Sequence, residues 1–314
     1  MSDGFASLAT EQSDPRYGDI DRLSVLDIAR LMNAADAEVP VAVGTALPTI
    51  ASTVDAVVER LSDSGRLLYI GAGSSGRLAV LDAAECPPTF GTHPDLVQGI
   101  IAGGPNALVR SLEGSEDDSA GGAAAIANVG AGPMDVVVGI SASGRTPYVV
   151  AAVAEARRRG ALTAGIACTV GGPLSQGVDY PIEVIVGPEV IAGSTRLKAG
   201  TATKLVLNMI STITMIKLGR TYGNRMIELS AMNTKLADRA IRIIVDVTGA
   251  DERRARQALE DAGRHVKVAI VMLEHGVDAA AAQALLDARG GRLDDIRGVR
   301  QRPADTSRND RRLS

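Results

Sequence analysis

The chain has 314 residues, 46% of them hydrophobic and 22% charged, which is typical of a folded globular protein and excludes a disordered or fibrous one. The formal net charge is −4 and no long basic block occurs within the part expected to fold, which argues against nucleic acid as a partner. Aromatic residues make up 2%, with no Trp, so the stacking surfaces of single-strand binders are missing and a small ligand held by polar groups fits better.

The N-terminal stretch and the cysteines favour a cytoplasmic protein. Residues 1–14 are polar and lack the basic start and apolar stretch of a signal peptide. Cys86 and Cys168 offer neither a disulfide framework nor a C-x-x-C metal pair, which suits a reducing compartment. The longest apolar stretch, Leu197–Leu218, carries three lysines that are costly inside a bilayer, so we expect a core helix there and no membrane partner.

The first part of the chain is predicted to be helical. Apolar residues recur at helical spacing across residues 22–64, for example Val25, Ile28 and Met32 at i, i+3 and i+7. Five short apolar runs then alternate with helical stretches. These runs are Leu67–Ile70, Gly99–Ala102, Asp135–Ile140, Thr163–Cys168 and Ile182–Val186. The alternation predicts βαβ units and an α/β fold, with a doubly wound three-layer α-β-α parallel sheet.

The C-terminal third is predicted to be helical from Leu197 onward. An Ala- and Leu-rich block between Asp251 and Arg289, with turns at Gly263 and Gly276, indicates three short helices and a small helical subdomain. The stretch from Gly291 to Ser314 is rich in Arg and Asp and nearly free of apolar clusters, so we expect a disordered tail. The expected parts are an N-terminal helical segment (1–50), the sheet domain (51–220), connecting helices (221–248), the helical subdomain (249–290) and the tail (291–314).

One strand-turn-helix signature occurs twice. The run Leu67–Ile70 continues into Gly71–Arg77, of sequence GAGSSGR, and Val136–Val138 continues into Gly139–Arg145, of sequence GISASGR. The end of a parallel strand that meets a helix N-terminus favours an anion, because free backbone N–H groups and the helix dipole point at it. Serine hydroxyls add donors, and glycine lets the backbone approach a ligand closely.

Other interpretations of these loops are open. Gly71, Gly73 and Gly76 fit G-x-G-x-x-G, but a dinucleotide fold also wants an acidic residue about 20 residues later, and the next strand ends without a carboxylate. The Walker phosphate-loop pattern of nucleoside triphosphatases also fails, because Arg77 and Arg145 follow Ser-Gly where Gly-Lys-Ser/Thr is required. A monophosphate site is therefore favoured, with a dinucleotide site and simple turn chemistry as the alternatives.

The paired hydroxyl loops resemble the sugar-isomerase (SIS) domain, which binds phosphosugars. Four ordered motifs extend the resemblance, from about Thr10 to Gly290, to the etherases that cleave the lactyl ether of N-acetylmuramic acid 6-phosphate. The motifs are Ala84–Thr89, Glu113–Asp117, Ala142–Tyr148 and Gly193–Thr201. The sequence departs from that family at Ser74, where many relatives carry Thr, and at Gln12–Asp14, where relatives tend to have a more basic stretch that ends in Asn.

The resemblance implies a carbon–oxygen lyase that needs no metal and no other cofactor. The open-chain aldehyde acidifies the hydrogen on carbon 2, the lactyl ether leaves from carbon 3, and water adds to give N-acetylglucosamine 6-phosphate and D-lactate. The alternatives are an aldose–ketose phosphosugar isomerase and a non-catalytic phosphosugar sensor, since the glucokinase regulatory protein is similar to these etherases. The resemblance also implies a homodimer whose active sites take residues from both chains.

The family's catalytic glutamates correspond to Glu85 and Glu116. Glu85 is followed by Cys86 and two prolines, a rigid and largely apolar surround that would raise its pKa and suit a general acid. Glu116 stands among other carboxylates, which suits an ionised base. Without the resemblance, Glu85 is a solvated carboxylate before a Pro-Pro turn and Glu116 belongs to an acidic first helical turn.

Phosphate and sugar are expected to be bound by the two loops and by a third hydroxyl-rich stretch before a long helix. Lys198 could supply a positive charge to this site, and the alternative is that it is a solvated lysine on the helix. The three histidines have no metal-ligand spacing. The expected binding residues are Gly73, Ser74, Ser75, Gly76, Ser141, Ser143, Gly144, Arg145, Thr146, Ser194, Thr195 and Lys198.

Overall fold

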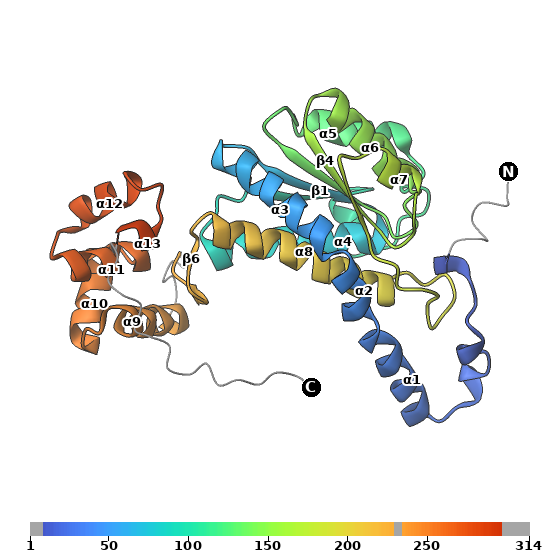
Figure 1. Ribbon diagram of the computed structural model, residues 1–314, viewed down its shortest axis with the longest axis horizontal. Coiled ribbons are helices and arrows are strands. Elements are labelled where there is room, and N and C mark those ends of the chain that lie inside the picture. The colour runs from blue at the N-terminus through green and yellow to red at the C-terminus, as the bar shows by residue number, and fades with distance from the viewer. Residues whose placement is uncertain (1–8, 229–233, 297–314) are drawn as a thin grey trace. The chain divides into compact units, whose positions relative to one another are not determined.

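The computed structural model describes residues 9–228 and 234–296 of the chain, and Figure 1 shows its elements. The described residues up to Lys217, apart from Pro88–Gly91, form one compact unit. Pro88–Gly91 and the described residues from Leu218 onward form the second unit. Among the described residues no single helix is long and apolar enough to cross a membrane, although two pairs of helices joined at a bend reach that length and composition together.

The N-terminal segment is helical, as its periodicity predicts, but it consists of several helices. Pro40 and Pro48 each occupy the first turn of a new helix, where a residue without an N–H group costs no hydrogen bond. The helices are interrupted at Glu38 and Ala46, and the chain bends by 61° at the second interruption. The elements are the 3₁₀ turns Ala9–Glu11, Pro15–Tyr17 and Ile20–Arg22 and the helices α1 (Val25–Ala37), α2 (Val39–Thr45) and α3 (Leu47–Ser62).

The first unit is built on a five-stranded parallel sheet with the order β2-β1-β3-β4-β5. Its elements are β1 (Leu67–Gly71), α4 (Gly73–Phe90), β2 (Val97–Ile101), a 3₁₀ turn (Pro105–Leu108), α5 (Ser119–Asn128), β3 (Val136–Ile140), α6 (Pro147–Arg158), β4 (Leu162–Ala167), α7 (Pro173–Gln176), β5 (Tyr180–Glu183) and α8 (Lys198–Lys217). The parallel α/β fold and its five strands are confirmed. The fifth strand ends earlier than predicted, because Val184 and Val186 are buried in the loop that follows it.

Both faces of the sheet are covered by helices, which gives the predicted three layers. Leu68 and Ile70 of β1 pack into one apolar cluster with Ile126 of α5 and Val149 of α6. Helices α3 and α8 pack against each other on the opposite face (Figure 1). Strand β1 is apolar throughout and all of its residues are buried, as expected for a parallel strand between two helical layers.

The strand order reverses direction between β1 and β3. Chain connections leave these neighbouring strands toward opposite sides, so a crevice opens beyond their carboxyl ends, and ligands of doubly wound sheets bind there. The register aligns Gly71 with Ile140, so both strands end at the same level. The two repeated loops therefore emerge side by side.

The second unit contains a hairpin that the sequence analysis missed. The prediction that the chain is helical from Leu197 onward is wrong at residues 221–226, which form two short antiparallel strands. Gly223-Asn224 forms the two-residue turn between them, and Gly223 has a φ of +55°. The elements of this unit are β6 (Thr221–Tyr222), β7 (Arg225–Met226), α9 (Thr234–Thr248), α10 (Glu252–Asp261), α11 (Val266–His275), α12 (Ala279–Asp287) and α13 (Leu293–Ile296). Within the expected tail, α13 is helical and residues 297–314 lie outside the described residues.

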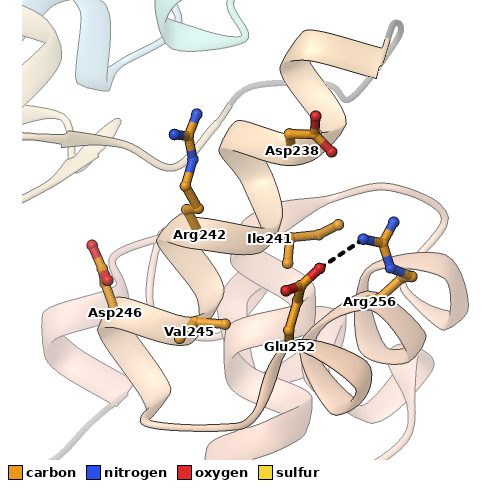
Figure 2. Close-up of a pocket in the computed structure, with 7 residues that line it drawn as sticks. All are labelled: Asp238, Ile241, Arg242, Val245, Asp246, Glu252 and Arg256. Carbon is orange, nitrogen blue, oxygen red and sulfur yellow. Dashed lines mark hydrogen bonds and ion pairs between the residues drawn. The ribbon is translucent and has the colours of Figure 1, made fainter.

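The helices of the second unit share an apolar cluster of their own, which includes Ile244, Leu259 and Ile270. A depression of about 400 Å³ lies on α9 and α10, with Ile241 and Val245 among its lining and charged residues around them (Figure 2). Glu252 and Arg256, one turn apart on α10, are joined there by a 2.9 Å hydrogen bond. None of the predicted site residues lines this depression.

Candidate active site

The first hydroxyl loop follows β1 and is also the start of α4. Gly73 takes a φ of +53°, and the helix begins there, so Ser74 and Ser75 occupy its first turn. The first N–H groups of a helix have no partner within it. A Cβ at Gly76 would lie 2.6 Å from Ile101 and 2.8 Å from the Gly71 carbonyl, so glycine is needed for the helix to pack this close to the strand.

The second loop follows β3 and is held by its own hydroxyls. The Ser141 Oγ lies 2.8 Å from the Thr146 Oγ1 and 3.3 Å from the Ser143 Oγ. Ser143 accepts a hydrogen bond from the Arg145 N–H, and its carbonyl accepts one from the Thr169 hydroxyl at 2.8 Å. Because Ser141 is buried and bonded on several sides, the loop presents its donors without further rearrangement.

The two loops and the third stretch line one pocket of about 320 Å³ at the predicted crevice. It brings together Gly73, Ser74, Ser75, Glu116, Ser141, Ser143, Arg145, Thr146 and Thr195 of the predicted set. Gly76 and Gly144 shape the loops beneath it, and neither they nor Ser194 line it. The Arg145 Nε is a buried donor with no hydrogen-bond partner among the described residues. An unpartnered guanidinium donor next to several hydroxyls is suited to an anion.

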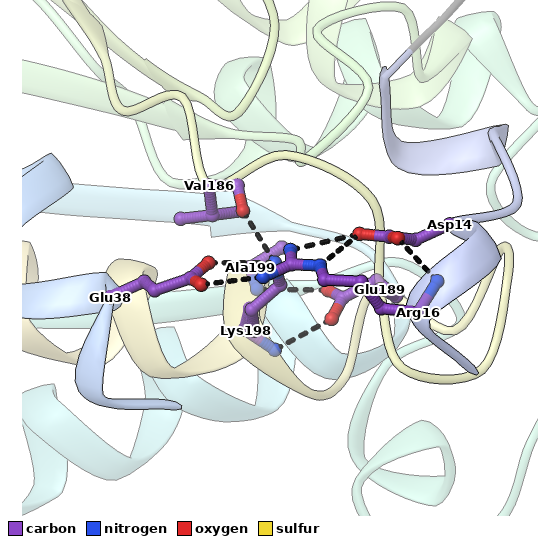
Figure 3. A network of polar contacts seen from close by, with 7 residues as sticks. All are labelled: Asp14, Arg16, Glu38, Val186, Glu189, Lys198 and Ala199. Carbon is purple, nitrogen blue, oxygen red and sulfur yellow. Dashed lines mark hydrogen bonds and ion pairs between the residues drawn. The ribbon is translucent and has the colours of Figure 1, made fainter. Parts of the chain in front are cut away.

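Lys198 does not line this pocket, nor is it solvated (Figure 3). It is 1% exposed, and its Nζ donates to the Val186 carbonyl at 2.7 Å and lies 3.8 Å from the Glu38 carboxylate. The buried Glu189 carboxylate accepts the N–H groups of Lys198 and Ala199, both at 2.9 Å, and so caps α8. The Lys198 ammonium group is therefore bound in the protein interior by the Val186 carbonyl and the Glu38 carboxylate.

Glu116 lines the pocket from the turn before α5. The alternative in which it belongs to the first turn of a helix fails, since α5 begins at Ser119 and Asp118 is its cap, accepting from the Gly121 N–H at 2.8 Å. The Glu116 carbonyl accepts from the Tyr148 N–H at 3.0 Å, which ties this turn to α6. The carboxylate itself is exposed toward the cavity and free to meet a ligand.

Glu85 lies outside the pocket of its own chain. Helix α4 continues through Pro87 and Pro88 to Phe90, so the expected Pro-Pro turn is absent. Glu85 is roughly three helical turns beyond Gly73, about 18 Å along the axis at 1.5 Å per residue. Its side chain is exposed in the single chain, whereas the neighbouring thiol of Cys86 is buried, and burial raises the pKa of that thiol to about 12. The apolar surround predicted for Glu85 therefore belongs to Cys86.

Seven further residues line the pocket that were not predicted to do so: Glu11, Ala72, Asp117, Ile140, Ala142, Pro147 and Gly193. The N-terminal segment reaches the site through a 3.1 Å hydrogen bond from the Gly193 N–H to the Thr10 carbonyl. The only sequence signal was the presence of these residues in or beside family motifs. Among the described residues, no cluster of three or more His, Cys, Asp or Glu side chains could hold a metal ion.

Two family models of SIS domains match the residues of the parallel sheet. The family model of the glucokinase regulatory protein N-terminal SIS domain matches residues 49–157, and that of the SIS domain matches residues 126–213. A solved phosphoheptose isomerase from Francisella tularensis is 21% identical, with a TM-score of 0.47 over 62% of this chain and 100% of that one.

The N-acetylmuramic acid 6-phosphate etherases of Streptomyces avermitilis and Rubrobacter xylanophilus are each 52% identical to this chain. The first alignment covers 91% of this chain and 92% of the relative, and the second covers 92% and 96%. Because the identity is this high over almost the whole length, the chain belongs to the N-acetylmuramic acid 6-phosphate etherase family, as its motifs predicted.

Proposed function

We propose that this chain is a carbon–oxygen lyase that converts N-acetylmuramic acid 6-phosphate and water into N-acetylglucosamine 6-phosphate and D-lactate. Family membership over 91% of the chain gives the reaction class. The observation that carries the proposal is the pocket in which two hydroxyl loops, an unpartnered arginine donor and Glu116 converge. The isomerase and sensor alternatives have no comparable support.

The phosphate is bound by the loops after β1 and β3. Ser74 and Ser75 offer hydroxyls and the N–H groups of a helix start, and Ser143 and Arg145 face them across the crevice. Charge-assisted hydrogen bonds from a guanidinium to phosphate are among the stronger polar contacts in proteins. The phosphate is thereby fixed, and the sugar carbons extend toward Glu116.

Glu116 takes the proton from carbon 2 of the ring-opened aldehyde. The electron pair of that C–H bond forms a double bond between carbons 2 and 3, the bond from carbon 3 to the lactyl oxygen breaks, and Glu85 gives that oxygen a proton. Water then adds its hydroxyl to carbon 3, and a proton returns to carbon 2. A positioned base and acid of this kind accelerate such steps by roughly 10²–10⁴-fold each.

The reaction is tested by incubation with N-acetylmuramic acid 6-phosphate in oxygen-18 water. The expected result is D-lactate together with the label on carbon 3 of the sugar. If no lactate is released, the proposed function is wrong. Lactate without label in the sugar would instead reject elimination followed by hydration.

The acid and base assignments are tested by exchange of the carbon 2 hydrogen in deuterium oxide. Glu85→Gln should release little lactate yet still exchange this hydrogen, because the base is intact. Glu116→Gln should lose both lactate release and exchange. If Glu116→Gln exchanges at the wild-type rate, another group is the base.

The active site is proposed to be shared between two copies of the chain. Glu85 is too far along α4 to meet a ligand in the pocket of its own chain, so a second copy must bring its Glu85 there. Leu81, one turn before Glu85 on the same helix, is 53% exposed, as expected of an interface residue. Sedimentation equilibrium should give a dimer. A cytoplasmic setting suits the free thiols of Cys86 and Cys168 and is tested by cell fractionation.

A further inference from the structure

A second, smaller chamber adjoins the candidate active site. It measures about 150 Å³ and shares Gly73 and Glu116 with the main pocket. One water molecule needs only ~15 Å³ of such space, so the chamber admits a group of several non-hydrogen atoms. A ligand that lies in the main pocket and passes Glu116 can therefore extend a substituent into this chamber.

Arg77 lines the chamber but not the main pocket. Its side chain is partly buried, and its Nε donates to the Leu108 carbonyl at 3.1 Å and its Nη2 to the Arg110 carbonyl at 3.0 Å. These two bonds hold the guanidinium in place without neutralising it. Within residues 9–228 and 234–296, no carboxylate forms an ion pair with Arg77, and its Nη1 has no hydrogen-bond partner. A fixed guanidinium with unmatched charge is suited to a planar carboxylate.

The other side chains of the chamber suit a small group that is partly apolar. Ala102 and Ala107 are buried and present methyl groups, and Leu112 lies beside them. Glu113 and Glu116 also line the chamber, so an anion is favoured only in contact with Arg77, the cationic side chain of its lining. The chamber thus offers a cation and an apolar wall to a ligand that carries both a carboxylate and a methyl group.

We propose that this chamber holds the lactyl group of the substrate and that Arg77 binds its carboxylate. The inference rests on the proposed function, in which Glu116 acts on carbon 2 and the lactyl ether is on carbon 3. Of the two substituents beside Glu116, the acetamido group is neutral, whereas the lactyl group carries a negative charge and a methyl. Only the lactyl group matches a guanidinium next to two alanines.

The test compares N-acetylmuramic acid 6-phosphate with its lactamide analogue, in which the lactyl carboxylate is a neutral amide. Wild type should prefer the acid by roughly 10–100-fold in kcat/KM, the range for a hydrogen bond between charged groups. Arg77→Gln should lower this ratio to near one, and Arg77→Lys should restore part of it. Arg110→Gln is the matched control, because this arginine is adjacent but its side chain does not line the chamber, and it should keep the wild-type ratio.

Calorimetric binding of N-acetylglucosamine 6-phosphate, which has no lactyl group, should be the same for Arg77→Gln and wild type. If this binding is lost as well, or if Arg77→Gln lowers kcat/KM for acid and amide equally, Arg77 only supports the loop at Leu108 and the assignment is wrong. A wild type that uses acid and amide equally well also overturns it. A wild type that releases neither lactate from the acid nor lactamide from the amide overturns the proposed function instead.

Discussion

Mixing subunits with different inactive glutamates tests whether the active site is shared. Glu116 lines the pocket, whereas Glu85 lies about 18 Å along α4 from Gly73 at the pocket's edge. Under the proposed function, we therefore expect a second chain to bring its Glu85 to the sugar that Glu116 contacts. Glu85→Gln and Glu116→Gln should each lower lactate release by roughly 10²–10⁴-fold when assayed alone.

Activity should return when the two variants exchange subunits. In an equal mixture of two-fold symmetric dimers, about half of the dimers contain one subunit of each kind. Each such dimer has one site with both substitutions and one site with neither, if every site takes Glu85 from one subunit and Glu116 from the other. About one site in four is then intact, and D-lactate release should recover to about a quarter of wild type.

The matched control is the double variant Glu85→Gln/Glu116→Gln mixed with wild type. With shared sites every mixed dimer is inactive, so activity should fall to about a quarter of the wild-type value, whereas separate sites would leave about half. If the two single variants form mixed dimers that stay inactive, and the control leaves half of the activity, each chain has its own complete site and the shared-site reasoning fails.

Three further predictions concern charged side chains. Arg145→Gln should weaken calorimetric binding of N-acetylglucosamine 6-phosphate roughly tenfold or more, because it removes a charged donor to phosphate; unchanged binding would contradict this role. Lys198→Met should leave that affinity unchanged but lower the free energy of unfolding in urea by about 1–3 kcal/mol, because the buried Val186 carbonyl loses its donor. Burial alone would raise the pKa of Asp135, but hydrogen bonds led by those from Arg66 outweigh it and lower this pKa. A carboxyl with a lowered folded pKa contributes stability that is complete above its ordinary value of 3.8 and is lost as the pH falls through the folded pKa, so urea unfolding of wild type should show this acid-side loss and that of Asp135→Asn should lack it.

The sheet was predictable because its determinants are local. The central strands β1 and β3 are short apolar runs whose residues are all buried, and each is followed by a helical stretch. The hairpin at residues 221–226 was missed because two strands of two residues leave almost no period-2 pattern, and only Gly223-Asn224 marks the turn.

The site was predictable where function follows from position along a strand. Ser74 lies three residues after β1 and Ser141 directly follows β3, so the parallel pairing of these neighbouring strands brings the two serines to one end of the sheet. The burial of Lys198 was not predicted, because it depends on contacts with Glu38 and Val186, which are distant in sequence. Sequence periodicity does not tell whether a lysine in the first turn of a helix faces solvent or a buried carbonyl.

The repeated Ser-Gly-Arg sequence shows how one motif gives its two arginines different tasks. Helix α4 begins at Gly73, ahead of the first copy, so Arg77 is already a full turn into the helix and is directed to the carbonyls of residues 108 and 110. In the second copy the helix begins only at Pro147, whose ring suits the first helical turn, so Arg145 stays in the loop with a buried Nε at the main pocket. Because the helix start differs, Arg145 lines the main pocket and Arg77 lines the adjoining chamber, which is the arrangement that our proposal requires for a substrate with two anionic ends.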